Sequence, residues 1–130
     1  MRDIDIIFRG KRVDNGEWIT ESETYIKDGD RTWLCDESND VVKVIPETVG
    51  QYTGLCDKNV KRVFEGDIVR YGDTIHRVVF EQRNGTAYFG IVISDIETWL
   101  FGYKCPANLM EVIGNIYDNP ELLKGGVENG

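Results

Sequence analysis

Turn-forming residues divide this chain into short segments, and no segment between them is long enough for a crossover helix. Candidate strands of about five to eight residues are separated by turns roughly every 8–12 residues. The clearest turn is Asn84-Gly85, which lies between two runs rich in β-branched and aromatic residues and is a strong hairpin signal. Because parallel strands need long crossover connections, the pattern predicts a mainly-β chain, a small SH3-like barrel or sandwich.

The two ends of the chain fit this prediction. Residues 14–16, Asp-Asn-Gly, offer positive-φ positions for an N-terminal β-hairpin, and the polar run 36–40 separates two further strands. Gly114 lies inside the last expected strand, where a bulge or a close backbone approach is the usual reason. Asn119 followed by Pro120 predicts the N-cap and the first residue of a short C-terminal helix.

The chain length of 130 residues fits one domain. Its hydrophobic fraction of 41% is too high for a disordered chain. We expect a single domain over residues 1–124, with an N-terminal β part over about 1–63, a small-barrel part over about 64–118 and a flexible tail at 125–130.

The charge balance is acidic, with 15 Lys and Arg against 23 Asp and Glu and a net charge of −8. Such a surface repels phosphate backbones and anionic lipids, so nucleic acid is a disfavoured partner. Arg9, Lys11 and Arg12 form a local basic cluster, but acidic residues such as Asp14 and Glu17 lie near it in the sequence. We interpret the cluster as a solvated face of mixed charge.

The sequence offers no apolar run of the ~18 residues that a membrane span needs, and no cleavable leader. We therefore expect no membrane partner and a soluble protein of the cytoplasm. Cys35, Cys56 and Cys105 are odd in number and form no C-x-x-C pair, which fits neither a disulfide framework nor a zinc site. We predict three reduced thiols, and no metal or other cofactor.

No catalytic motif stands out. His76 is the one histidine, and acid–base catalysis or metal binding would require partners beside it. Its alternating position in a strand favours a solvent-facing or cross-strand role.

The glycine-flanked stretch VGQYTGL, residues 49–55, is one candidate binding surface, through Gln51, Tyr52 and Thr53. It lacks the helix N-terminus and the lysine that phosphate binding would need. The alternative interpretation is a corner that packs Tyr52 into the core.

The aromatic segment ETWLFGY is the second candidate binding surface. In an extended strand, Trp99, Phe101 and Tyr103 point to one side. These rings could belong to the core, or to a surface for self-association or for a partner. The sequence leaves both readings open.

Three separated sequence motifs of this chain resemble those of a known protein family. FRGKRVDNGEW at 8–18, VIPETVGQYTGL.DKN with FEGDIV between 44 and 69, and EVIGNIYDNPELL at 111–123 resemble the YopX family of bacteriophage and prophage proteins. Residues of about 19–43 and 72–108 look like variable parts of that family. The resemblance implies a phage-encoded, self-associating protein of the host bacterial cytoplasm, and it offers no assigned active site to carry over.

The chain departs from the family pattern at Asp57-Lys58-Asn59-Val60, where the family commonly has Asn-Gly after Asp-Lys. A β-branched valine tolerates positive φ poorly. We therefore expect Asn59 to be the only positive-φ residue of this turn, unless the turn type has changed.

These observations favour a non-enzymatic, self-associating binding or accessory module whose partner is an unidentified phage or host protein. One alternative is a small-molecule-binding protein or enzyme that uses the VGQYTG corner. Another is an acidic inhibitor or nucleic-acid mimic, which would require the carboxylates to gather into one stripe.

Overall fold

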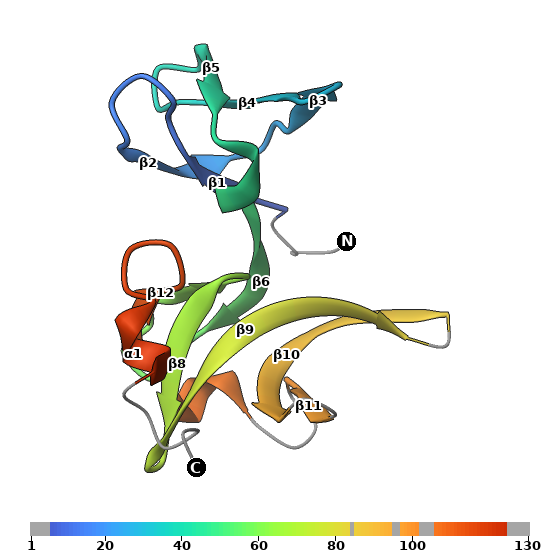
Figure 1. Cartoon of the computed structure of the whole chain (residues 1–130), viewed down its shortest axis with the longest axis vertical. Coiled ribbons are helices and arrows are strands. Elements are labelled where there is room, and N and C mark those ends of the chain that lie inside the picture. The colour runs from blue at the N-terminus through green and yellow to red at the C-terminus, as the bar shows by residue number, and fades with distance from the viewer. Residues whose placement is uncertain (1–5, 84, 95–96, 102–105, 125–130) are drawn as a thin grey trace. The chain divides into compact units, whose positions relative to one another are not determined.

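The computed structural model describes residues 6–83, 85–94, 97–101 and 106–124, and Figure 1 shows its elements. The chain divides into two compact units, Met1–Gly54 and Leu55–Gly130. The boundary falls inside strand β6 (Gly50–Cys56), and the domain bounds expected from the sequence stay a prediction. The predicted tail at 125–130 lies outside the described residues.

The first unit begins with the predicted hairpin. Strand β1 (Phe8–Lys11) pairs antiparallel with β2 (Trp18–Ser22), and on its other side pairs with the start of β6. Gly16 has a φ of 75°, and its N–H donates to the carbonyl of Arg12 at 3.0 Å. The positive-φ glycine thus closes the connection, as the sequence predicts.

A second sheet of the first unit contains β3 (Ile26–Asp28), β4 (Arg31–Cys35) and β5 (Val41–Val44), in that order. Alternate residues of β4 face inward, because successive side chains of a strand point to opposite faces. Leu34 and Val44 are fully buried and form a core cluster with Ile19 of β2. This cluster joins the two sheets of the unit.

The second unit contains a five-stranded antiparallel sheet of order β11-β10-β9-β8-β12. The strands of this sheet are β8 (Asp67–Tyr71), β9 (Thr74–Arg83), β10 (Thr86–Ser94), β11 (Glu97–Leu100) and β12 (Glu111–Asn115). Strand β7 (Arg62–Phe64) belongs instead to the four-stranded sheet of order β2-β1-β6-β7. Arg83 pairs with Thr86, which confirms the predicted hairpin, while Asn84 itself lies outside the described residues. The core cluster contains Val63, Val69, Val78, Ile91, Met110 and Val112.

The mainly-β prediction is confirmed, whereas the SH3-like form stays a prediction. Across the described part of the chain, the strands form three antiparallel sheets that do not close into a barrel. The helical segments are short: η1 (Pro46–Thr48), η2 (Ala107–Leu109) and α1 (Glu121–Lys124). The described residues contain no helix long and apolar enough to cross a membrane.

The C-terminal motif folds around Gly114. The pairing of β12 with β8 shifts register between Val112 and Gly114, which confirms the predicted bulge. A Cβ on Gly114 would lie 2.6 Å from Oδ1 of Asn119. That same oxygen accepts the backbone N–H of Asn115 at 3.2 Å, so the Asn119 side chain points back toward β12. The Asn119 carbonyl accepts the backbone N–H of Leu122 at 3.0 Å, and the N-cap role of its side chain stays a prediction.

We predict that Gly114→Ala destabilises the protein by about 1–3 kcal/mol, because the new methyl group must displace Asn119. Urea unfolding monitored by circular dichroism measures the loss. The double variant Gly114→Ala/Asn119→Ala serves as the control, since it removes the colliding side chain. If Gly114→Ala alone leaves the stability unchanged, the close approach is not a constraint on this sequence.

Candidate functional site

The central motif is organised by the side chain of Asp57. Its Oδ1 accepts the backbone N–H groups of Asn59 and Lys61, both at 2.8 Å. The backbone N–H of Val60 donates to the Asp57 carbonyl at 2.9 Å, and Asp57 N–H donates to the Lys61 carbonyl at 2.8 Å. These four bonds define the turn between β6 and β7.

The same turn occurs in the first unit, between β4 and β5. Oδ1 of Asp36 accepts the backbone N–H groups of Ser38 and Asp40, both at 2.9 Å. The N–H of Asn39 donates to the Asp36 carbonyl, and Asp36 N–H donates to the Asp40 carbonyl. Asp36 and Asp57 therefore fix two hairpins with one pattern of hydrogen bonds.

The fourth residue of each turn is left-handed. Asn39 has a φ of 68° and Val60 a φ of 65°. The expectation that Asn59 would take the positive φ is wrong. Val60 takes it because the four hydrogen bonds of the turn fix that backbone geometry, and its side chain is 80% exposed, so no packing is gained in return.

The two turns predict reciprocal effects of an exchange of residues. Val60→Asn should stabilise the protein by about 1 kcal/mol, and Asn39→Val should destabilise it by a similar amount, because a left-handed β-branched residue costs about 1–2 kcal/mol. Denaturant unfolding of both variants measures the two effects. Changes of the same sign in both would contradict the common geometry.

The second oxygen of Asp57 anchors another segment. Oδ2 accepts the backbone N–H of Val112 in β12 at 2.8 Å, and Asp57 is buried. Burial alone raises the pKa of this carboxyl, but the hydrogen bonds from Val112, Lys61 and Asn59 lower it, and the pKa lies below its ordinary value of 3.8. The folded state thus favours the ionised carboxylate.

We predict that Asp57→Asn costs about 1–3 kcal/mol near neutral pH, because an amide NH₂ would face the Val112 N–H. Because the folded state lowers the pKa of Asp57, its full contribution to the free energy of unfolding is present above pH 3.8, the ordinary pKa. That contribution is lost as the pH falls through the pKa of the folded state. The stability gap between wild type and variant should narrow there.

Unfolding by urea at a series of pH values measures this gap. Asp73→Asn is the matched control, because Asp73 is exposed and its replacement should change little. A gap that stays constant down to strongly acidic pH would contradict the assigned role of the Asp57 carboxylate.

The neighbouring motif carboxylate is also part of the scaffold. Asp67 is buried, and its Oδ2 accepts the backbone N–H of Phe64 at 2.7 Å. Gly66 between them has a φ of 94°. The EGD segment is therefore turn chemistry, as its sequence indicates.

The first predicted binding surface lies on β6. Tyr52 is buried, and its backbone N–H donates to the Ile7 carbonyl at 2.8 Å. Gln51 and Thr53 are half-buried. Their role in binding stays a prediction, and none of the three lines the groove described below.

The second predicted surface lies on and after β11. Trp99 and Phe101 are partly buried and pack against the core cluster of the second unit. Trp99 Nε1 also donates to Oε2 of Glu97 at 2.6 Å. Tyr103 lies outside the described residues, and an interface between copies at this segment stays a prediction.

His76 is held within its sheet. Its Nδ1 lies 2.9 Å from the Val92 carbonyl and its Nε2 lies 2.6 Å from Oγ1 of Thr74. Among the described residues, no cluster of three or more His, Cys, Asp or Glu could hold a metal ion. Cys35 and Cys56 are not joined in a disulfide, and Cys105 lies outside the described residues.

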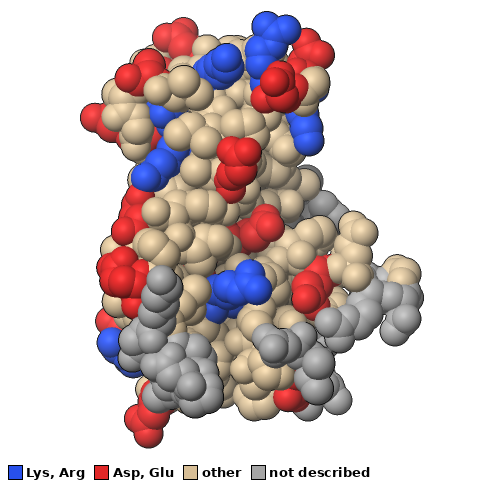
Figure 2. Space-filling model, in the orientation of Figure 1, with Lys and Arg blue, Asp and Glu red and all other residues tan. Residues whose placement is uncertain are grey.

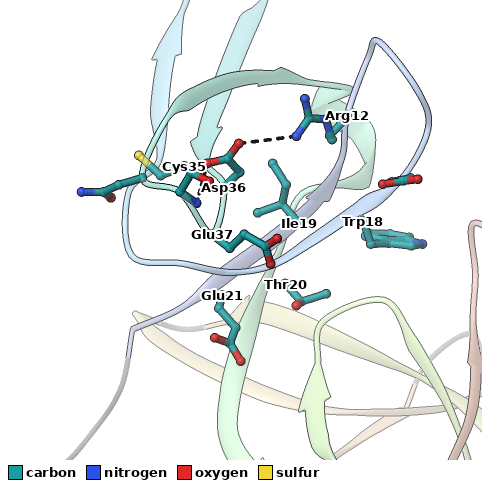
Figure 3. Close-up of a pocket in the computed structure, with 11 residues that line it drawn as sticks. Arg12, Trp18, Ile19, Thr20, Glu21, Cys35, Asp36 and Glu37 are labelled. Atoms are coloured by element: carbon teal, nitrogen blue, oxygen red, sulfur yellow. Dashed lines mark hydrogen bonds and ion pairs between the residues drawn. The ribbon is translucent and has the colours of Figure 1, made fainter.

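A groove that the sequence did not predict lies in the first unit (Figure 3). Its volume is about 620 Å³. Two runs of consecutive residues form its walls, 17–21 with β2 and 35–39 with the Asp36 turn, and Arg12 completes it. The lining residues are Arg12, Glu17, Trp18, Ile19, Thr20, Glu21, Cys35, Asp36, Glu37, Ser38 and Asn39.

The groove is acidic. It contains four carboxylates, those of Glu17, Glu21, Asp36 and Glu37, and one cationic group, the guanidinium of Arg12. Ile19 also lines the groove; it is only 7% exposed and adds an apolar surface beside these charged groups. Nothing in the spacing of these residues predicts the groove, because the packing of two sheets brings 17–21 and 35–39 together.

The guanidinium of Arg12 is already engaged. Its Nε and Nη2 donate to the two carboxylate oxygens of Asp14, both at 2.9 Å, and its Nη1 lies 3.6 Å from Oδ2 of Asp36. The hydrogen bond to Arg12 lowers the pKa of Asp14, and the same bond raises the pKa of Arg12. Both groups therefore stay charged.

The neighbouring basic residues are less solvated than expected. Arg9 is buried, with its guanidinium 5.0 Å from the centre of the Trp18 ring, and Lys11 Nζ lies 5.6 Å from the same ring. Cation–π contact thus replaces the predicted solvated position of Arg9. On the face shown in Figure 2, acidic and basic side chains are interspersed rather than gathered into an acidic stripe.

Comparison with known families identifies the chain. The sequence profile described as YopX protein matches residues 7–124, nearly the whole chain. The chain belongs to the YopX family. No sequence among curated proteins matches it, so the structural role of each YopX motif rests on the geometry above.

Proposed function

We propose that this YopX protein is a non-enzymatic binding module that receives a cationic side chain of a partner protein in the groove of its first unit. One observation carries the proposal: a single concave surface combines four carboxylates with the nearly buried Ile19. In Figure 3, the Ile19 side chain lies among Arg12, Asp36 and Glu37.

A lysine or arginine side chain matches this combination because it joins an aliphatic stem to a cationic head. The stem would lie against Ile19 and the head would pair with Glu37, which forms no ion pair with any other described residue. Exposed pairs contribute only about 0–1 kcal/mol each. One side chain alone should therefore bind weakly, with a dissociation constant no lower than the order of 1 mM, which corresponds to about 4 kcal/mol.

The buried carboxylates of the central YopX motif belong to the scaffold and not to the groove. Asp57 and Asp67 use their carboxylates to hold backbone N–H groups, so these motif carboxylates serve the fold. In this proposal the partner is a protein of a phage or of its bacterial host, because the chain resembles phage and prophage proteins.

We predict that Nα-acetyl-arginine methylamide shifts the backbone amide resonances of residues 17–21 and 35–39 in a titration followed by nuclear magnetic resonance. The citrulline analogue, which has nearly the same shape without the charge, should shift them far less. Glu37→Gln should weaken arginine binding about threefold or more. Glu47→Gln is the control, because Glu47 is exposed and lies outside the groove.

Equal shifts with the arginine and citrulline probes would contradict the proposal. Arginine-induced shifts confined to other residues would contradict it as well.

A further inference from the structure

The sheet of β3, β4 and β5 has an inner and an outer face (Figure 1). Thr32 and Leu34 of β4 are buried on the inner face. Since successive side chains of a strand point to opposite faces, Arg31, Trp33 and Cys35 lie on the outer face. Of these three residues, only Cys35 also lines the groove, so the outer face is a different surface.

The outer face is unusually apolar. Ile26 of β3 pairs with Trp33, and Val41 of β5 pairs with Cys35. Residues paired in this way share a face and lie side by side, so the four form a continuous patch. Ile26 is 41% exposed and Val41 57% exposed. An antiparallel sheet usually carries polar residues on its solvated face, and a contiguous apolar patch there is typical of an interaction site.

Two cationic side chains border this patch. Lys43 of β5 pairs with Trp33 on its other side, and the guanidinium of Arg31 lies 6.0 Å from the centre of the Trp33 ring. Lys43 and Arg31 are exposed, and neither forms an ion pair with any residue that the structure describes. Asp28, which pairs with Arg31, adds one negative charge. The strand residues of this face therefore carry an excess of positive charge in a chain of net charge −8.

We infer that the outer face of β3, β4 and β5 is a docking surface for an acidic segment of a partner protein that also carries an apolar side chain. The apolar side chain would cover Trp33 and Ile26, and the carboxylates would pair with Lys43 and Arg31. Tryptophan and arginine are the residue types that most often anchor interfaces. This inference goes beyond the proposed function, because this surface selects the opposite charge from the groove.

Charge complementarity favours this occupant over two others. A nucleic acid would carry its run of phosphates beyond the two cations and across a chain of net charge −8. A second copy that used the same face would bring the excess positive charge of both faces together. A short acidic segment needs only the two cations and the apolar patch between them.

The test uses the full chain and a short acetylated peptide amide in which glutamate alternates with leucine. In a titration followed by nuclear magnetic resonance, the peptide should shift the indole N–H resonance of Trp33, which is assigned by its loss in Trp33→Phe. Backbone amides of β3, β4 and β5 should shift with it. A peptide in which glutamine replaces every glutamate should cause far smaller shifts.

Charge reversal on the protein provides the second arm. Lys43→Glu should weaken binding of the glutamate peptide about threefold or more, and Arg31→Glu/Lys43→Glu about tenfold or more. Lys27→Glu is the matched control, because Lys27 is an exposed residue of the same sheet that pairs with the inward-facing Thr32. It should change the affinity less than twofold, by the rough size of a distant, screened charge. Circular dichroism checks that each variant is folded.

Four results would overturn the inference. The first is equal shifts with the glutamate and glutamine peptides, or none with either. The second is the same loss of affinity in Lys27→Glu as in Lys43→Glu. The third is tighter binding of oligothymidylate than of the glutamate peptide at Trp33, which would make a nucleic acid the occupant. The fourth is a Trp33 resonance that moves with protein concentration alone, which would make a second copy the occupant.

Discussion

The second unit depends on one buried carboxylate, that of Asp57. Burial of an ionised group is costly unless hydrogen bonds replace its water, and Asp57 accepts three backbone N–H groups from two segments far apart in the sequence. It thereby fixes the turn between β6 and β7 and holds β12 next to that turn. Because β12 pairs with β8, the end of the five-stranded sheet is tied to the same side chain.

The protein uses this aspartate turn twice, with different consequences. In the second unit Oδ2 of Asp57, the oxygen that does not bond within the turn, accepts a backbone N–H of β12, and the turn stabilises the fold. In the first unit the corresponding oxygen of Asp36, Oδ2, lies 3.6 Å from Nη1 of Arg12, and the turn forms a wall of the groove. One local geometry therefore serves the scaffold in one place and an accessible surface in the other.

Local sequence signals predicted the local structure well. The turn at residues 14–16, the hairpin of β9 and β10, the bulge at Gly114 and the C-terminal helix all follow from residues close together in the chain. The left-handed Val60 was not predictable from propensity, because the hydrogen bonds of Asp57 override the preference of a β-branched residue.

The groove of the candidate site could not be predicted from local sequence signals. Its walls, 17–21 and 35–39, come together only when the buried Ile19 packs on Leu34 and Val44 between two sheets. No spacing in the sequence encodes that contact. Most of the groove also lies outside the three blocks that resemble the YopX family, so the family resemblance directs attention to the scaffold rather than to this surface.

In the proposed function, the motif carboxylate of Asp57 stabilises the fold, whereas the groove carboxylates bind the partner. The most direct test measures both unfolding free energy and affinity for a lysine-rich peptide in Asp57→Asn and in Glu37→Gln, at a temperature where both variants are folded. We expect Asp57→Asn to lose stability and keep its affinity, and Glu37→Gln to keep its stability and lose affinity. Loss of affinity in Asp57→Asn with full affinity in Glu37→Gln would contradict the account.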